Sequence, residues 1–456
     1  MVTDPVPGML ERATELLEAE FGSLPALETN LDAAAMASVL AETAHRLGDN
    51  YPYFHPLYAG QMLKPPHPVA RAAYALAMTV NPNNHARDGG RASSEMEIEA
   101  VQGIAAMVGW EKGSYLGHLT SSGTLANLEA LWIAGQLSPG KRIVGSAEAH
   151  YTHRRISAVL KLEFSSIAAD NRGRMSLEAL ETELRKGDVG TVVATLGTTA
   201  MGAVDPLDEI LVLQKRYGFR VHVDAAYGGY FRLIAEELDE PARRAYAAMG
   251  EADSTVIDPH KHGLQPYGCG CILFRDPGVG RFYKHDSPYT YFTSKELHLG
   301  EISLECSRAG ASAVALWATQ RLLPLTPGGE FARGLAQSRR AAQELDRRLR
   351  QEKRFEALAA GGPELDIVVW KAAAATQEQA SELAQRIFVA CATRDLHLAL
   401  VQLREFWFRP LVSALETAET QLLTCLRSVL MKPEHEAWLD RIWDRLMSAS
   451  IEAGGE

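Results

Sequence analysis

Two short segments place a charged side chain at the end of an apolar run. In R-V-H-V-D-A-A-Y-G-G the run ends at Asp224, and in V-I-D-P-H-K-H-G it ends just before Lys261. A carboxylate at the carboxyl end of a parallel strand points into the crevice where α/β proteins bind ligands. It requires a cationic partner there, because an isolated buried carboxylate is costly. On this segment alone, a ligand site and a structural salt bridge explain Asp224 equally well.

Lys261 lies between His260 and His262. A lysine amine acts as a nucleophile only after it loses a proton, and both partial desolvation and neighbouring positive groups promote that loss. The two histidines could supply such neighbours. Because a lone lysine is nearly always a solvated surface group, the chemical interpretation of Lys261 depends on the other segments.

A third segment, S-S-G-T-L-A-N-L-E-A-L, places Ser122, Gly123 and Thr124 directly before a run of strong helix formers. The start of a helix offers free N–H groups and a favourable dipole, which bind anions such as phosphate. Taken alone, these three residues are more typical of an ordinary helix cap.

Together the three segments supply what is needed to hold pyridoxal phosphate. The helix start would bind the phosphate, Asp224 the pyridinium nitrogen and Lys261 the aldehyde. In A-E-A-H-Y-T-H-R-R, His150 adds a flat ring that could stack on the pyridine. We therefore predict that these residues converge on one cofactor site.

The elements that must position these residues are strands and helices in alternation, which predicts an α/β fold with a largely parallel sheet. The expected strands are K-R-I-V-G-S, T-V-V-A-T-L-G, R-V-H-V-D-A-A, S-T-V-I-D and C-G-C-I-L-F-R. Two helical patterns precede this region, and the segment 51–95 between them and the strands is rich in Pro and Asn, which favours structured loops.

Long helices and the runs E-L-D-I-V-V-W-K-A and L-H-L-A-L-V-Q-L predict a second, smaller α/β domain at the C-terminal end. We therefore divide the chain into an N-terminal helical arm (1–60), a large cofactor-binding domain (61–320) and a small C-terminal domain (321–456).

The composition argues against several other classes of protein. The net charge is −11 and the basic residues are scattered, so no nucleic-acid partner is expected. No leader pattern and no run long enough to cross a bilayer occurs, so no membrane association is expected. Five cysteines, an odd number, fit a reducing compartment and predict a cytoplasmic protein.

Five stretches in order resemble the group II pyridoxal-phosphate-dependent amino acid decarboxylases, the family of aromatic amino acid and glutamate decarboxylases. They are T-S-S-G-T-L-A-N-L-E-A-L, A-E-A-H-Y-T-H-R-R-I-S-A-V-L, V-V-A-T-L-G-T-T-A-M-G-A-V-D-P-L-D-E-I, H-V-D-A-A-Y-G-G-Y and D-P-H-K-H-G. The resemblance implies the type I, aspartate aminotransferase-like fold with a mainly parallel seven-stranded sheet. It also implies a homodimer with active sites at the subunit interface.

The resemblance assigns roles to individual residues. Lys261 would form the internal aldimine, Asp224 would pair with the pyridine nitrogen, and His150 would stack on the ring near the substrate carboxylate. The remaining cofactor contacts would come from Ser122, Gly123, Thr124 and His260 at the phosphate, Ala226 on the other ring face and Thr199 at the ring substituents. His262 departs from the family, which often has Trp after the lysine.

The implied reaction is decarboxylation of an L-amino acid to an amine and carbon dioxide through an external aldimine and a quinonoid. The family commonly uses a loop tyrosine to protonate the product carbon, and Tyr291 is preferred here over Tyr289. Tyr53, Phe54 and His55 would line the substrate side chain. The possible carboxylate clamps are Arg308, Arg87 and Arg409. An aromatic substrate is favoured, with aspartate, glutamate or cysteine sulfinate next.

Two other classes of enzyme stay open. The same fold also supports aldehyde synthases, aminotransferases and carbon–carbon lyases. A metal-dependent hydrolase could use His150 with His153, or His260 with His262, but neither pair has a third ligand nearby in the sequence. We therefore expect no bound metal.

Overall fold

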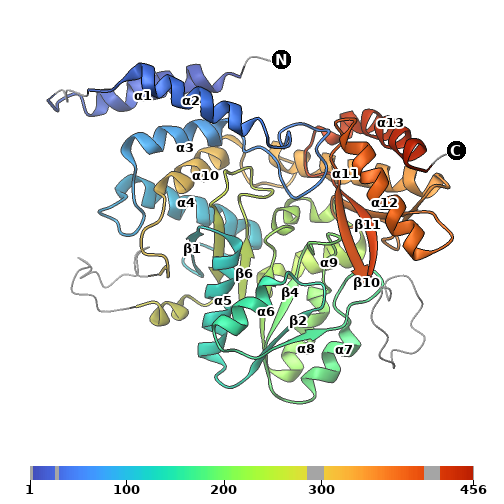
Figure 1. Ribbon diagram of the computed structural model, residues 1–456. Helices are drawn as coiled ribbons and strands as arrows, with labels where there is room; N and C mark the ends of the chain where they lie inside the picture. The colour runs from blue at the N-terminus through green and yellow to red at the C-terminus, as the bar shows by residue number, and fades with distance from the viewer. Residues whose placement is uncertain (1–3, 26–29, 285–301, 405–421, 455–456) are drawn as a thin grey trace.

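The computed structural model describes residues 4–25, 30–284, 302–404 and 422–454, and two β-sheets organise this part of the chain (Figure 1). The larger sheet has the strand order β1-β7-β6-β5-β4-β2-β3. Its strands are β1 (Leu116–Thr120), β2 (Arg142–Ser146), β3 (Phe164–Ile167), β4 (Val189–Thr195), β5 (Arg220–Asp224), β6 (Ser254–Ile257) and β7 (Gly270–Phe274). Neighbouring strands from β3 to β6 are parallel, whereas β7 runs antiparallel to β6 and β1. This confirms the prediction of a mainly parallel seven-stranded sheet.

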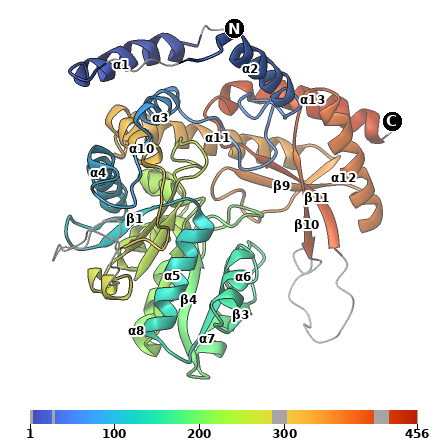
Figure 2. The same cartoon turned by 60° about the vertical axis from the view of Figure 1, so that its left-hand side comes forward.

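Helices pack on both faces of this sheet, on the smaller C-terminal sheet and in the N-terminal arm. They are α1 (Val6–Glu20), α2 (Ala33–Leu47), α3 (Pro68–Val80), α4 (Arg91–Val108), α5 (Gly123–Leu137), α6 (Thr152–Val159), α7 (Leu177–Leu184), α8 (Leu207–Tyr217), α9 (Glu240–Ala247), α10 (Gly310–Leu322), α11 (Glu330–Gln351), α12 (Gln377–Ala392) and α13 (His435–Gly454), with short 3-10 segments η1 (Gly229–Glu237), η2 (Ala248–Glu251) and η3 (Pro277–Phe282). Figure 2 shows α5 and α6 side by side on one face of the sheet.

Alternation along the strands decides which side chains reach the α5 and α6 face. On β5, Val221 and Val223 belong to the core beneath α8. His222, between them, instead contacts Asn127 of α5, with 2.9 Å between its Nε2 and the amide oxygen. Because side chains two residues apart in a strand point to the same face, Asp224 lies on this face as well.

The start of α5 follows from its sequence. Ser122 caps the helix by accepting a hydrogen bond on its hydroxyl from the N–H of Leu125 at 3.2 Å. Ala126 and Ala130 then pack against Val256 and Ile272 of the sheet. This packing fixes the N-terminus of α5 beside the carboxyl end of β6.

The expectation of loops throughout residues 51–95 is wrong for Pro68–Val80, which form α3. Pro68 stands at the first helical position, where its missing N–H is not needed. The His67 side chain accepts a hydrogen bond from the N–H of Val69 at 3.2 Å and caps the helix. The following alanine-rich run has high helix propensity, which outweighs the Pro and Asn residues around it.

The smaller sheet is antiparallel, with the order β10-β11-β9-β8. Its strands are β8 (Phe355–Ala357), β9 (Ile367–Ala372), β10 (Ala399–Arg404) and β11 (Leu422–Val429). A segment near the N-terminus also bonds to this sheet. The N–H of Ala59 donates to the carbonyl of His397, and the N–H of Val429 donates to the carbonyl of Ala59, both at 2.8 Å. Residues just before α3 therefore belong to the core of the C-terminal sheet.

None of the helices within the described ranges combines the length and the apolar character needed to cross a membrane.

Candidate active site

A cavity of about 200 Å³ lies beyond the carboxyl ends of β4, β5 and β6, next to the start of α5. The structure brings to its wall all of the residues that the sequence assigns to the cofactor: Ser122, Gly123, Thr124, His150, Thr199, Asp224, Ala226, His260 and Lys261. They come from three strand ends and two helix starts, so the parallel sheet is what gathers them.

Lys261 follows β6 by a tight turn. Its N–H donates to the carbonyl of Asp258 at 2.9 Å, and its Nζ lies 3.1 Å from Asp258 Oδ2. The lysine side chain keeps 23% of its surface exposed, whereas Asp258 is buried. The amine therefore faces the cavity with a single carboxylate behind it.

Asp224 is held from two sides. Its Oδ1 accepts the N–H of Ala226 at 3.1 Å, and its Oδ2 lies 2.8 Å from His153 Nε2. Burial alone would raise the pKa of this carboxyl group, but the hydrogen bond and charge of His153, with the charge of Lys261, hold the pKa well below its ordinary value. Asp224 is therefore a carboxylate at neutral pH, as a partner for a protonated pyridine nitrogen must be.

His150 is held in one tautomer. Its Nδ1 accepts the N–H of Thr152 at 3.3 Å, so the hydrogen of the neutral ring is on Nε2. Burial lowers the pKa of His150, and the nearby charges of Lys261 and His153 lower it further, although Asp224 opposes them. The ring is neutral at neutral pH and lines the cavity, which suits stacking on an aromatic cofactor.

The α5 end of the cavity fits a phosphate. The first N–H groups of a helix have no partner within the helix, and those of α5 open next to Ser122 and His260. Gly123 is required there, because a Cβ at this position would come within 2.4 Å of the Asp258 carboxylate. The residues present thus fit all three parts of pyridoxal phosphate: its phosphate, its ring nitrogen and its aldehyde.

His262 does not stand beside the lysine amine as the sequence suggests. It is fully buried behind the cavity wall, where its Nε2 lies 3.2 Å from Asp366 Oδ2. The hydroxyl of Tyr227 donates to the other oxygen of Asp366 at 2.6 Å. Adjacent residues of an irregular turn can point in opposite directions, so here only His260 of the two histidines faces the cavity.

Three residues expected at the substrate side chain do not line this cavity. The ring of Tyr53 packs edge-on against Tyr58 at 4.9 Å between centroids, and His55 packs against Trp438 at 4.8 Å. Phe54 is 70% exposed. Within a single chain, this segment packs beside the C-terminal sheet instead.

Arg308 is held by several partners within the described fold. Its Nη1 donates at 2.7 Å to both Glu97 Oε1 and the carbonyl of Leu119, and its Nη2 donates to the carbonyl of Asn84 at 3.0 Å. The guanidinium is buried and ties α4 to β1. Both of its Nη atoms are bound within the described fold, and Arg308 does not line the Lys261 cavity.

The other expected residues lie elsewhere. Arg87 pairs with Glu95 on the surface. Tyr289, Tyr291 and Arg409 lie outside the described residues.

One residue that the sequence reasoning missed is Arg427, on β11. Its side chain is almost fully buried, its Nη1 donates to the carbonyl of Thr199 at 3.1 Å, and its Nη2 donates to Gln61 Oε1 at 2.7 Å. Its Nε has no partner among the described residues, and no carboxylate of the described chain pairs with it. The signal for it was a lone arginine within the apolar run L-L-T-C-L-R-S-V-L.

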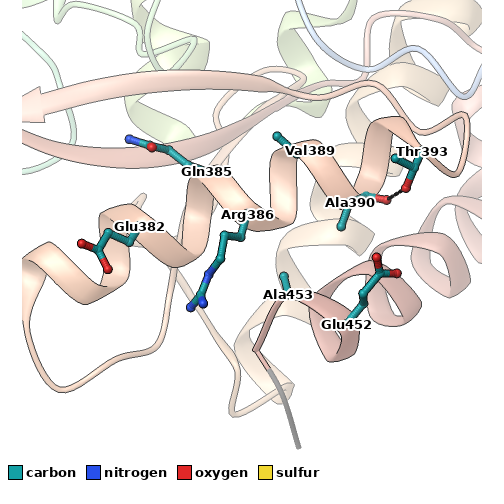
Figure 3. Close-up of a pocket in the computed structure, with 8 residues that line it drawn as sticks. All are labelled: Glu382, Gln385, Arg386, Val389, Ala390, Thr393, Glu452 and Ala453. Atoms are coloured by element: carbon teal, nitrogen blue, oxygen red, sulfur yellow. Dashed lines mark hydrogen bonds between the residues drawn. The ribbon is translucent and has the colours of Figure 1, made fainter.

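A larger but open hollow of about 740 Å³ lies between α12 and the end of α13 (Figure 3). Glu382 and Arg386 point from α12, and Glu452 lies across from them on α13. Of the described residues that line this hollow, none lines the Lys261 cavity. It carries no group suited to the chemistry of that cavity.

The histidines do not form a metal centre in the described ranges. No group of three His, Cys, Asp or Glu side chains there is placed to hold a metal ion. His153 instead pairs with Asp224, and His262 with Asp366.

The chain is similar to known amino acid decarboxylases. The pyridoxal-dependent decarboxylase conserved domain matches residues 52–373. An L-tyrosine decarboxylase of Enterococcus faecium is 28% identical over 442 residues, covering 74% of this chain and 72% of that protein. A probable L-tyrosine/L-aspartate decarboxylase of Methanothermobacter thermautotrophicus is 29% identical over 266 residues, covering 58% of this chain and 70% of that protein. The structure of Oryza sativa TDC with PLP and tryptamine superposes with a TM-score of 0.76 at 18% identity, covering 99% of both chains.

The sheet, its helical layers and the cavity at its strand ends define an α/β enzyme with the fold of the group II decarboxylases. The chain belongs to the pyridoxal-dependent decarboxylase family. It is a pyridoxal-phosphate-dependent amino acid decarboxylase.

Proposed function

We propose that this enzyme removes the carboxyl group of an aromatic L-amino acid and yields the corresponding amine. Aspartate, glutamate and cysteine sulfinate are the next candidates. The assignment of Lys261, Asp224 and His150 to the cofactor is part of this proposal, and it is supported by their convergence on one cavity.

The observation that carries the proposal is the buried guanidinium of Arg427 beside Thr199. A buried charge without an oppositely charged partner is costly, and a bound carboxylate would remove that cost. Arginine suits this task because its planar fork pairs with a carboxylate through two parallel hydrogen bonds. We propose that Arg427 binds the α-carboxylate of the substrate.

The reaction then divides between the cofactor and the chain. Bound pyridoxal phosphate supplies an electron sink for the bond broken at Cα. When the cofactor is bound, Asp224 would hold a negative charge against its ring nitrogen, and Lys261 would hold its aldehyde. His150 would lie against one face of the ring, and Arg427 would hold the substrate carboxylate in one orientation.

The preference for an aromatic substrate rests on the arginines. An acidic amino acid carries a second carboxylate, which requires a second cation in the site. Arg308 and Arg87, two of the candidates for that task, are bound to Glu97 and Glu95. The similarity to an L-tyrosine decarboxylase supports the same choice. Comparing kcat/KM for tyrosine, tryptophan and phenylalanine with that for the acidic amino acids tests it, and a higher value for an acidic substrate would overturn the preference.

We propose Tyr291, with Tyr289 as second choice, as the residue that delivers a proton to Cα. This proposal rests on the sequence resemblance alone. It favours the amine over the aldehyde as the product.

We also propose a homodimer. Helix α2 has no buried residue, and Met36, Val39, Leu40 and Leu47 on it are between 49% and 64% exposed. Apolar side chains gathered on one unpartnered helix indicate a protein interface, and a second copy of this chain is the partner we propose. Figure 2 shows α2 at the margin of the molecule, where a second copy can reach it.

We keep two further expectations as proposals. The five cysteines are all unpaired, which supports a cytoplasmic location. The two sheets support a division into an arm (1–60), a large domain (61–320) and a small domain (321–456).

A further inference from the structure

His153 lies directly behind Asp224, on the side away from the cavity. It stands in the first turn of α6, three residues after His150, and its side chain is fully buried. Its Nε2 is 2.8 Å from Asp224 Oδ2. Because an ionised carboxylate can only accept hydrogen bonds, Nε2 carries the hydrogen and donates it.

The ring makes this one polar contact. Its Nδ1 is buried and has no hydrogen-bond partner among the described residues. The neighbouring His222 does not share Asp224, since its two nitrogens already bond Ser254 Oγ and Asn127 Oδ1, both at 2.9 Å. Among the described residues, the His153 ring therefore has Asp224 as its single hydrogen-bond partner.

Without this donor, Asp224 would keep only the N–H of Ala226 as a hydrogen-bond partner among the described residues. A buried carboxyl group with fewer donors favours its neutral, protonated form and is free to rotate. A neutral carboxyl group no longer accepts strongly from a protonated pyridine nitrogen. The two donors together hold Oδ1 and Oδ2 in fixed positions.

We propose that His153 is a positioning residue that orients the Asp224 carboxylate toward the ring nitrogen of pyridoxal phosphate. The inference rests on the proposed pairing of Asp224 with that nitrogen. It gives His153 a role through Asp224 and no contact with substrate or cofactor.

The test measures recognition of the ring nitrogen by binding rather than by turnover. The full-length protein is stripped of cofactor and titrated with pyridoxal phosphate, and separately with an analogue in which CH replaces the ring nitrogen. The Kd of the analogue divided by the Kd of pyridoxal phosphate reports the contact to that nitrogen. We call this quotient the ratio. We expect wild type to prefer pyridoxal phosphate, and His153→Leu to reduce the ratio about tenfold or more, since a hydrogen bond to a charged group contributes on that scale.

Variants at the same position separate orientation from packing. His153→Gln keeps an N–H donor and should retain most of the ratio. His153→Met fills similar space without a donor and repeats the test if the leucine variant does not fold. A methionine or leucine variant that binds with the wild-type ratio overturns the inference.

His118 provides a matched control. Its Nε2 lies 2.8 Å from Glu129 Oε2, and both side chains are buried, but neither lines the cavity. His118→Leu should lower stability and leave the ratio unchanged. An equal loss of the ratio in this variant would show that losing any buried histidine–carboxylate pair has the effect, and would overturn the inference.

Asp224→Asn separates this inference from the proposed site. If Asp224→Asn removes the preference for pyridoxal phosphate while His153→Leu keeps it, the proposed role of His153 is refuted. The proposed pairing of Asp224 with the ring nitrogen then stands. If Asp224→Asn keeps the ratio, or if wild type shows no preference, both fail.

Discussion

Arg427 of the C-terminal sheet donates a hydrogen bond from Nη1 to the carbonyl oxygen of Thr199 at 3.1 Å. Thr199 lines the cavity that the larger sheet builds around Lys261. The C-terminal sheet therefore places a buried cation next to one residue of the cavity wall, although Arg427 itself does not line the cavity. The account of substrate binding depends on this contact.

Arg427→Gln should lower kcat/KM about 10- to 100-fold while leaving the absorbance of the bound cofactor unchanged. The reason is that charge-assisted hydrogen bonds contribute about 1.5–3 kcal/mol. Arg427→Lys keeps the charge but loses the planar fork, so its kcat/KM should lie between those of the wild type and of Arg427→Gln. Steady-state kinetics on the cofactor-loaded variants measures the effect.

Arg308→Gln is the comparison for that experiment. It leaves Glu97 as a buried charge without its partner, which costs about 3–5 kcal/mol of stability. Folded Arg308→Gln protein should keep its KM. If this variant raises KM and the Arg427 variant does not, the roles of the two arginines are reversed.

Lys261→Ala should remove the borohydride-reducible link between the chain and pyridoxal phosphate, together with nearly all turnover. The amine of Lys261 faces the cavity beside Asp258, and no second lysine of the described chain lines that cavity. Mass spectrometry of the reduced protein locates the adduct. The exposed Lys284 serves as control, and Lys284→Ala should keep the link. An adduct retained in the Lys261 variant would place the cofactor on another lysine.

The double variant Val39→Asp, Leu40→Asp should convert the proposed dimer to a monomer, because it puts charges on the apolar face of α2. Light scattering or sedimentation measures the mass. Val212→Asp is the matched control, since Val212 is 65% exposed on α8, and it should remain a dimer. A wild-type protein that is monomeric at micromolar concentration would refute the proposed interface.

Acid should destabilise the protein through its buried histidines. Burial lowers the pKa of His435 to about 3, and the charge of Lys432 adds to this; burial likewise lowers the pKa of His222 to about 3. The unfolded chain takes up these protons near pH 6.5, whereas the folded chain does not take them up until about pH 3. Stability from these groups is therefore complete above pH 6.5 and declines as the pH falls toward 3.

Each such histidine lowers the free energy of unfolding by about 1.4 kcal/mol for every pH unit below the pKa that it has in the unfolded chain. His435→Gln should reduce the measured slope by about this amount between about pH 5.5 and 4, as determined by urea denaturation. His45→Gln, on the exposed α2, should leave the slope unchanged. An unaltered slope in the His435 variant would contradict the assignment.

The local sequence is sufficient to predict the position of a candidate site residue where that residue lies at the end of a strand or at the start of a helix. Asp224 ends β5 and Lys261 follows β6, as the apolar runs predict. Ser122 caps α5, and the alanines of this helix pack it against the sheet. Each of these features is decided by neighbours in sequence, and the parallel sheet then brings the strand ends together.

Features that depend on distant partners could not be predicted in this way. Arg308 looks like a free cation until Glu97, 211 residues away, is seen to pair with it. His262 points away from the cavity because Asp366 attracts it from the C-terminal sheet. Arg427 lies on β11, a strand that the sequence analysis does not predict, and its partner Thr199 lies 228 residues away.

The central claim is that this chain releases carbon dioxide from an amino acid at the Lys261 site. The most direct measurement incubates the cofactor-loaded enzyme with each of the twenty common L-amino acids and cysteine sulfinate, records carbon dioxide and identifies the products by mass. The account predicts carbon dioxide and the matching amine in equal amounts, foremost from an aromatic amino acid, and neither product from Lys261→Ala. Absence of carbon dioxide from every amino acid, with a keto acid or a carbon–carbon cleavage product in its place, would contradict it.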